Sequence, residues 1–372
     1  MSSLMEEISK KAWDLGIPLN VQFDLTYRCN ERCIHCYLDH HDHGEMTTAE
    51  IKAILDQLAE AGVLSLVFSG GEILLRKDLF EILEHARSLL FQVRLKTDGI
   101  LIREDEAKRI RNLGVSQVQI SIYSHRPEVH DGITKVPGSL ERSIRAIRFL
   151  KSQGIEVTIA NVLMRQNMLD YPGVRALGAE LGASVTIDPT ITPKIDGDNS
   201  VTALRIPEAV LKQVFNDEAL VGNVQEFCAP PAAADESALD GYSCSAGHTF
   251  CYVSPYGDVY PCVQFPLPCG NLRRQSFLDI WRGSRELEEV RSIRVRDLPT
   301  CSGCVHAAGC TRCPGLAYME GDMRGPSSAD CEKSYTRTGI PTANMNSKAR
   351  RAQLVQIQSL LRPPAPTQAL QA

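Results

Sequence analysis

The chain has 372 residues, of which 43% are hydrophobic and 23% charged, as in ordinary soluble globular proteins. Its 40 lysines and arginines against 45 aspartates and glutamates give a formal net charge of −5, so there is no broad basic surface for nucleic acid or an anionic membrane. No apolar run approaches the ~20 residues that span a bilayer. The charged lead-in, residues 1–18, lacks a signal-peptide core, so we expect a cytoplasmic protein whose 13 cysteines bind metal rather than form disulfides.

Residues 19–200 alternate strand-like runs with amphipathic helical segments. The six runs are short, apolar and rich in β-branched residues, as buried parallel strands are: NVQFDLTY, VLSLVF, QVRLKT, SQVQISIY, EVTIANVL and SVTID. One helix is expected to begin at Thr47, which has capping-box spacing to Glu50, and to end at Gly62. Six β-then-α units predict an α/β fold, a partial (β/α)6 barrel of the TIM type, with its chemistry at the carboxyl ends of the strands.

Three cysteines follow the first strand in YRCNERCIHCY, with the spacing C-x3-C-x2-C; they are Cys29, Cys33 and Cys36. Thiolates are soft ligands that suit iron–sulfur clusters or zinc. A four-iron cubane held by three thiolates leaves one iron open to a small molecule that binds through an amine and a carboxylate. The alternative is a zinc site completed by one of the nearby histidines, which are His35, His40, His41 and His43. The spacing favours a cluster over zinc.

The remainder of the chain has a different composition. Residues 201–240 are expected to form a connector, because the stretch FCAPPAAADES is rich in proline, alanine and serine. Residues 241–335 are cysteine-dense and should form a small second domain, with a β-hairpin at TFCYVSPYGDVYPC and short helices around SFLDIWRGSRELEEVRSI. Residues 336–372 are expected to be a partly disordered tail.

Two cysteine patterns mark this second domain. The patterns are Cys244-x12-Gly257-x4-Cys262 and Cys301-x2-Cys304-x5-Cys310-x2-Cys313, the latter followed by Cys331. In a zinc ribbon the two CxxC pairs are usually separated by about 15–20 residues, whereas here five residues separate them. The short gap favours thiols shared between iron–sulfur clusters, as in ferredoxin-type runs.

The first cysteine motif, followed by Tyr37, resembles the signature of the radical S-adenosylmethionine (radical SAM) superfamily. SGGE at 69–72 resembles the GGE motif of that family, which receives the methionine amino group of S-adenosylmethionine (AdoMet), although Ile73 stands where many members have proline. KTDG at 96–99 resembles the family's TNG, with Asp98 in place of asparagine. The resemblance implies AdoMet-binding residues at Tyr37, Gly70, Gly71, Glu72, Ser121, Asn161 and Arg165.

The second domain resembles the SPASM extension of radical SAM enzymes, which carries auxiliary [4Fe–4S] clusters. The resemblance implies a first auxiliary cluster held by Cys244, Cys262 and Cys313, with Cys251 as the fourth ligand. It implies a second cluster held by Cys301, Cys304, Cys310 and Cys331. The sequence departs from the family pattern once, with two residues rather than three before Cys313. The sequence identifies no general acid or base.

The resemblance implies three [4Fe–4S] clusters and an enzyme that cleaves AdoMet to a 5′-deoxyadenosyl radical. The expected substrate is a peptide or protein, modified oxidatively by crosslinking or in the maturation of a ribosomal peptide or peptide-derived cofactor. The alternatives are oxidative modification or decarboxylation of a small molecule such as a haem precursor, and a non-enzymatic zinc or electron-transfer protein. The expected partners are the peptide and an electron donor such as flavodoxin or ferredoxin. Because 28 residues precede Cys29, a separate protein would be needed to bind a leader peptide.

Overall fold

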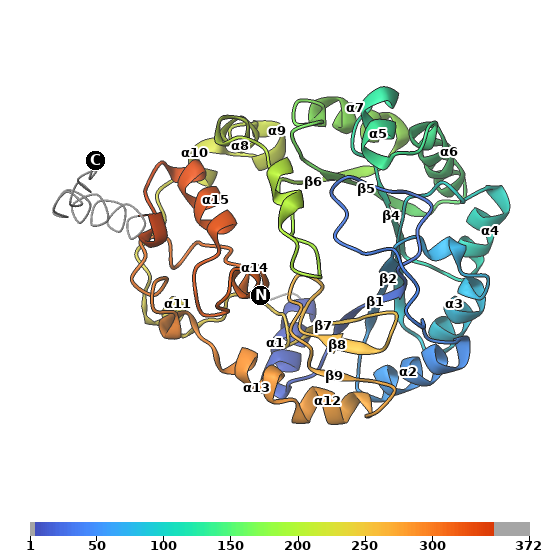
Figure 1. The fold of residues 1–372 in the computed structure, drawn as a ribbon, viewed down its shortest axis with the longest axis horizontal. Helices are drawn as coiled ribbons and strands as arrows, with labels where there is room; N and C mark the ends of the chain where they lie inside the picture. Colours follow the sequence, from blue (N-terminus) through green and yellow to red (C-terminus); the bar gives the residue numbers. More distant parts are fainter. Residues whose placement is uncertain (1–3, 346–372) are drawn as a thin grey trace, which may run out of the picture.

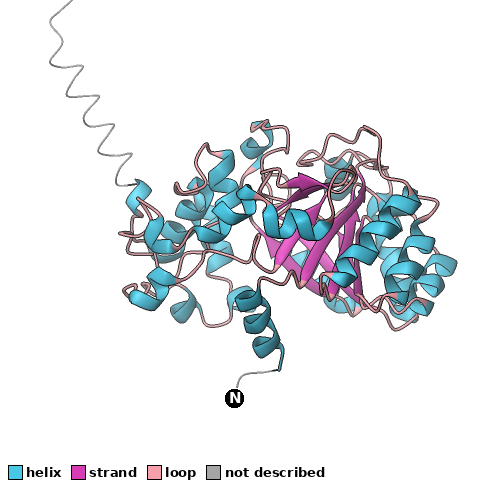
Figure 2. Ribbon diagram, turned by 90° about the horizontal axis from the view of Figure 1, so that it is seen from below, coloured by secondary structure: helices cyan, strands magenta, loops and turns pink. Residues whose placement is uncertain are grey.

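The computed structural model describes residues 4–345, so most of the predicted tail lies outside the described residues. Six parallel strands form a curved sheet in which neighbours in sequence are neighbours in space, and helices cover its outer face (Figures 1 and 2). The strands are β1 (Asn20–Thr26), β2 (Ser65–Gly70), β3 (Gln92–Thr97), β4 (Gln117–Ser121), β5 (Glu156–Val162) and β6 (Ser184–Asp188). The predicted partial barrel is therefore confirmed, and each strand lies within its predicted run except β2, which extends two residues past it to Gly70.

The crossover segments are amphipathic helices whose apolar sides pack on the sheet. They are η1 (Ile73–Leu75), α2 (Thr48–Glu60), α3 (Leu79–Ser88), α4 (Glu104–Asn112), α5 (Pro127–Thr134), α6 (Ser139–Ser152) and α7 (Tyr171–Leu181). Helix α2 begins with the predicted capping box, since Glu50 N donates to Thr47 Oγ1 and Thr47 N donates to Glu50 Oε2. On β1, Val21 and Phe23 are fully buried in this outer core, so the alternating Gln22 and Asp24 face the barrel interior.

The predicted hairpin joins the barrel sheet. It comprises β7 (Phe250–Val253) and β8 (Asp258–Tyr260), which pair antiparallel, followed by β9 (Gly270–Asn271). Strand β7 also pairs in parallel with β1, from Asn20 opposite Phe250 to Phe23 opposite Val253. The result is one nine-stranded sheet in the order β6-β5-β4-β3-β2-β1-β7-β8-β9. The second domain therefore starts as a continuation of the barrel beside the strand that leads to the cysteine motif (Figure 1).

The segment between the two domains carries more regular structure than a connector would. It contains η2 (Ser200–Leu204), α8 (Glu208–Phe215), α9 (Glu218–Val221), α10 (Val224–Phe227) and α11 (Glu236–Asp240). Helix α8 is fixed because Val210, Leu211 and Val214 are buried together with Leu163, which follows β5. Within this segment, the Pro/Ala stretch between α10 and α11 has no regular secondary structure.

The cysteine-rich part is built from short helices and loops; in Figure 1, α15 lies at the left and α12 and α13 lie along the lower edge. These are α12 (Phe277–Gly283), α13 (Arg285–Ser292), η3 (Val295–Asp297), α14 (Pro314–Met319) and α15 (Ser328–Thr338). The lead-in forms α1 (Leu4–Leu15), where Trp13 stacks on His248 with ring centroids 4.2 Å apart, so this helix packs against the segment that precedes β7. None of the helices between residues 4 and 345 has the length and apolarity that crossing a membrane requires.

Candidate active site and cluster-binding sites

A cavity of about 380 Å³ lies at the carboxyl ends of the parallel strands. Its wall brings together most of the residues that the sequence singled out: Cys29, Cys33, Cys36, Tyr37, Gly70, Gly71, Ser121 and Asn161. Two other predicted residues, Glu72 and Arg165, do not line it. The three cysteines come from the loop after β1, and the glycines, serine and asparagine come from the ends of β2, β4 and β5.

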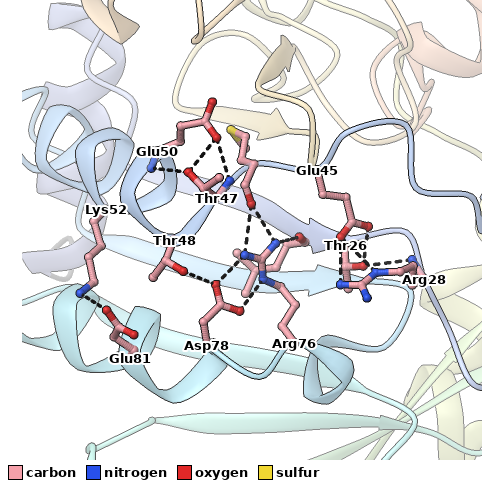
Figure 3. A network of polar contacts seen from close by, with 12 residues as sticks. Thr26, Arg28, Glu45, Thr47, Thr48, Glu50, Lys52, Arg76, Asp78 and Glu81 are labelled. Carbon is pink, nitrogen blue, oxygen red and sulfur yellow. Dashed lines mark hydrogen bonds and ion pairs between the residues drawn. The ribbon is translucent and has the colours of Figure 1, made fainter.

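The loop that carries the three cysteines is tied at both ends (Figure 3). Arg76 donates through Nη1 to the carbonyl oxygens of Leu25 and Met46, at 3.0 and 3.1 Å, and it forms a 2.6 Å ion pair with Asp78. Glu45 adds a second tie, because its Oε1 accepts from Tyr27 N at 2.9 Å. Residues 27–45 therefore form a loop whose entry and exit are held by one buried guanidinium.

The two glycines of SGGE are required by close backbone contact. A Cβ on Gly70 would lie 2.1 Å from the carbonyl oxygen of Thr26, and one on Gly71 would lie 2.3 Å from that of Arg28. Gly70 also has φ +132°, which side chains of L-residues rarely adopt. At this short separation, Gly71 N donates to Thr26 O at 2.8 Å. The glycine loop is thus hydrogen-bonded to the start of the cysteine loop.

Glu72 lies behind this loop rather than in the cavity. It is fully buried, and its Oε2 accepts from Thr97 Oγ1 at 2.7 Å and from Asp98 N at 2.9 Å, while Oε1 accepts from Leu74 N at 2.8 Å. Burial, reinforced by the neighbouring Asp98 carboxylate, raises the pKa of Glu72 well above its ordinary value. The Glu72 side chain therefore connects the ends of β2 and β3. It would influence a ligand in the cavity by holding Asp98 and the glycine loop in place, not by direct contact.

Arg165 lies outside the cavity. Its side chain is exposed, and its Nε donates to the carbonyl oxygen of Ala203 at 3.0 Å. The prediction that it pairs with the methionine carboxylate therefore finds no geometric support in the arrangement of the described residues.

Two buried oxygen atoms without partners test whether the cavity fits the amino-acid part of AdoMet. Asp98 Oδ1 accepts from Ile100 N at 2.8 Å, whereas its Oδ2 has no hydrogen bond of ordinary geometry among the described residues, although Asn30 and Glu72 lie nearby. Asn161 Nδ2 donates to Ile122 O at 2.7 Å, and its Oδ1 is likewise buried without a partner. Both residues line the cavity, and buried acceptors without donors suit an ammonium group. The site therefore fits an amine beside three thiols.

Asp98 was not predicted as a binding residue. The available sequence signal was its place in KTDG at the end of a strand, where the resemblance was noted but no role was assigned.

The four cysteines assigned to the second auxiliary cluster lie around one cavity. This cavity, about 280 Å³ in volume, is lined by Cys301, Cys304, Cys310 and Cys331 together with Arg312. Across the described residues, no three His, Cys, Asp or Glu side chains converge closely enough to hold a single metal ion. Four thiols spaced around a cavity of this size are the donor set of a four-iron cubane, in which each iron takes one thiolate.

The cysteines assigned to the first auxiliary cluster fall into two groups. Cys244, Cys262 and Cys313 lie close to one another: burial raises the pKa of Cys262 to about 11, and the two neighbouring thiols add to this rise. Cys251 is fully buried in the hydrophobic core, near Cys269, and Cys262 is also close enough to act on its thiol electrostatically. Its neighbour on β7, Tyr252, points into the barrel and donates to Asp24 Oδ2 at 3.0 Å, so Cys251 faces the outer side of the sheet.

The barrel interior beside the cavity is polar. Asp24 is fully buried and accepts from Gln22 Nε2 at 3.1 Å and from Tyr252, whose hydroxyl also lies 2.6 Å from that of Tyr27. Burial raises the pKa of Asp24 from 3.8 to about 6, against the lowering effect of these hydrogen bonds and of Lys96. This polar group was not predicted, although the alternation of polar and apolar residues along β1 was its signal.

Comparison with known proteins gives the same picture. A model of the radical SAM superfamily matches residues 23–173, and a model of the SPASM iron–sulfur cluster-binding domain matches residues 244–305. The chain is 31% identical to an AdoMet-dependent heme synthase of Oleidesulfovibrio alaskensis over 323 residues, covering 80% of this chain and 83% of that protein. It is also 31% identical to a PqqA peptide cyclase of Xanthomonas campestris pv. campestris over 341 residues, covering 87% and 89%.

The fold is also found among solved structures. The crystal structure of Streptococcus suis SuiB bound to its precursor peptide SuiA matches with a TM-score of 0.69 at 18% identity, covering 88% of this chain and 79% of SuiB. The chain therefore belongs to the radical SAM superfamily, as an enzyme that carries a SPASM domain and uses [4Fe–4S] clusters and AdoMet.

Proposed function

We propose that this enzyme oxidatively modifies a peptide or protein substrate, by crosslinking or a related C–H functionalisation. The observation that carries the proposal is the cavity that joins three cysteines of one loop to the ends of five parallel strands, β2 to β6, with eight further predicted ligand cysteines in the adjoining domain. When bound, the cluster and AdoMet supply a 5′-deoxyadenosyl radical that abstracts hydrogen, and the auxiliary clusters supply an exit for the second electron.

The chain's own residues would prepare this site in distinct ways. Cys29, Cys33 and Cys36 would hold the cluster, and the Gly70–Gly71 backbone with Asp98, Ser121, Asn161 and Tyr37 would bind AdoMet. We assign residues 19–200 to this barrel and 241–335 to the auxiliary-cluster domain, joined by the helical segment 201–240. The apolar outer core behind the strands keeps the cavity rigid and limits the entry of water, which reactive radical chemistry requires.

A peptide substrate is supported by the similarity to the PqqA peptide cyclase. We further propose a cytoplasmic location, an electron donor such as flavodoxin or ferredoxin, and a separate protein that binds a leader peptide.

The second candidate substrate is a haem precursor, modified by oxidation or decarboxylation of a side chain. The similarity to the AdoMet-dependent heme synthase over 80% of this chain favours it. A side chain of a tetrapyrrole could enter the same cavity while the ring stays at its mouth.

One experiment separates these candidates. The protein is reconstituted anaerobically, its iron and sulfide are counted, and it is incubated with AdoMet and dithionite beside a candidate precursor peptide or a haem precursor. About twelve irons and the formation of 5′-deoxyadenosine are expected, on the basis of three four-iron clusters. Modification of the peptide, detected by mass spectrometry, supports the first candidate; modification of the tetrapyrrole alone rejects it. A variant with Cys29, Cys33 and Cys36 replaced by alanine is expected to form no 5′-deoxyadenosine.

A further inference from the structure

A lysine on the barrel interior has unused hydrogen-bonding capacity. Lys96 and Asp98 on the inward side of β3 both line the cavity, and Lys96 is half-buried. Its Nζ donates to Gln22 Oε1 at 3.0 Å, which is its one hydrogen bond to the described residues. An ammonium group carries three N–H donors. Two donors therefore remain for a ligand in the cavity.

Lys96 has no salt-bridge partner among the described residues. It is the one lysine or arginine among the residues of the described chain that line the cavity, and Arg94, on the same side of β3, has a buried Nε without a hydrogen-bond partner. Asp24 attracts Lys96 electrostatically, but its two oxygens accept from Gln22 and Tyr252. Three acids also line the cavity: Glu31, Asp98 and Asp188. An ammonium group with two free N–H donors and no salt bridge can still donate to an anion that enters the cavity.

Lys96 shares the cavity wall with residues from both parts of the chain. Asp98 and the three-cysteine loop come from the barrel, whereas Val263 and Gln264, which directly follow Cys262, come from the cysteine-rich part. Gln264 Nε2 donates to Thr192 Oγ1 at 2.7 Å, so neutral polar groups surround the space beside Lys96. A carboxylate held there would have a charged donor and several neutral ones.

We propose that Lys96 binds a carboxylate of the substrate and thereby positions the neighbouring carbon for reaction. This inference rests on the proposed function and deepens it, because it names the substrate class: a molecule with a carboxylate next to the reacting group. Such a group is present at a peptide C-terminus or an acidic side chain, and equally on a propionate of a tetrapyrrole. The carboxylate of AdoMet is the competing occupant, so the test must measure AdoMet separately.

The test compares acids with their neutral counterparts in wild type, Lys96→Met and Lys108→Met. The last variant removes an exposed lysine of α4 and is the matched control. Binding to the reconstituted proteins is measured by calorimetry for four probes: a candidate precursor peptide with a free C-terminus, the same peptide as its C-terminal amide, coproporphyrin III, and its tetramethyl ester. AdoMet binding is measured in parallel.

We expect at least one free acid to bind the wild type more tightly than its neutral counterpart does. We expect Lys96→Met to lower the affinity for that acid by about 10- to 100-fold, as for the loss of a hydrogen bond to a charged group. The neutral probes and AdoMet should bind Lys96→Met and wild type alike, and Lys108→Met should behave as wild type. Whether the peptide or the porphyrin shows the effect identifies the source of the carboxylate.

Three results would overturn the proposal: wild type shows no preference for either acid, Lys96→Met retains the preference, or Lys96→Met loses AdoMet affinity by the same factor. Failure of the proposed function is distinguishable, because it is read from products rather than from binding: the wild-type enzyme, incubated with AdoMet and dithionite, then leaves the precursor peptide unmodified whatever the probes bind.

Discussion

Replacing Arg76 with methionine is expected to loosen the loop that holds the three cysteines. The guanidinium is only 7% exposed and donates to the carbonyl oxygens of Leu25 and Met46 as well as to Asp78. Removing one partner of a buried ion pair typically costs about 3–5 kcal/mol. Asp78 is 22% exposed and keeps its 2.6 Å hydrogen bond from Thr48, so we expect a loss of about 3 kcal/mol in the free energy of unfolding, at the lower end of that range.

Urea denaturation of the apoprotein, followed by circular dichroism, measures this loss. The matched control is Arg111→Met on the exposed side of α4, where we expect a change of less than about 0.5 kcal/mol. Because the loop from residue 27 to residue 45 depends on this tie, Arg76→Met should also retain less iron at the three-cysteine site after reconstitution. A loss below about 1 kcal/mol together with full iron content would refute the reasoning.

Three further predictions concern the glycine loop, the interior acid and the core cysteine. Gly71→Ala should lower AdoMet affinity more than tenfold in calorimetry, because its Cβ would lie 2.3 Å from Arg28 O; Gly132→Ala, where nothing lies within 4 Å of the added Cβ, should leave that affinity unchanged. In the folded state the pKa of Asp24 is raised from 3.8 to about 6, so the free energy of unfolding should fall by about 3 kcal/mol as the pH rises through this range. Asp24→Asn should remove this fall, which is measured as the urea midpoint of unfolding against pH. Cys251→Ala should lower the free energy of unfolding by about 1–2 kcal/mol, because a core atom is lost. Its iron content should stay at the wild-type level, because the thiol faces the outer core. Iron loss equal to that of Cys244→Ala would instead confirm Cys251 as the predicted fourth ligand.

Local sequence patterns were sufficient for the main barrel elements. The six strands follow from short β-branched runs, and the start of α2 follows from the Thr47–Glu50 spacing, because both are set by interactions within a few residues. The grouping of Cys301, Cys304, Cys310 and Cys331 came instead from the resemblance to the SPASM domain, because spacing alone does not separate Cys313 from them; these four cysteines line one cavity.

The features that escaped prediction depend on contacts between distant segments. The pairing of β7 with β1 joins residues about 230 positions apart, and no local pattern specifies that register. The inward direction of Lys96 and the outward direction of Cys251 follow from the parity of each strand once the sheet is assembled. Arg165 ends the expected strand region, but the chain turns there so that its side chain lies at the surface near Ala203.

The shared sheet has a consequence for the spacing between the metal-binding regions. The cysteine loop leaves the end of β1, and the hairpin that leads to Cys262 begins at β7, which is locked to β1 from Asn20 to Phe23. The separation between the three-cysteine loop and Cys262 is therefore set by strand register, not by the long stretch of chain between them. Insertions in the crossover loops can change which molecules enter the cavity while the distance between these two cysteine sites stays constant.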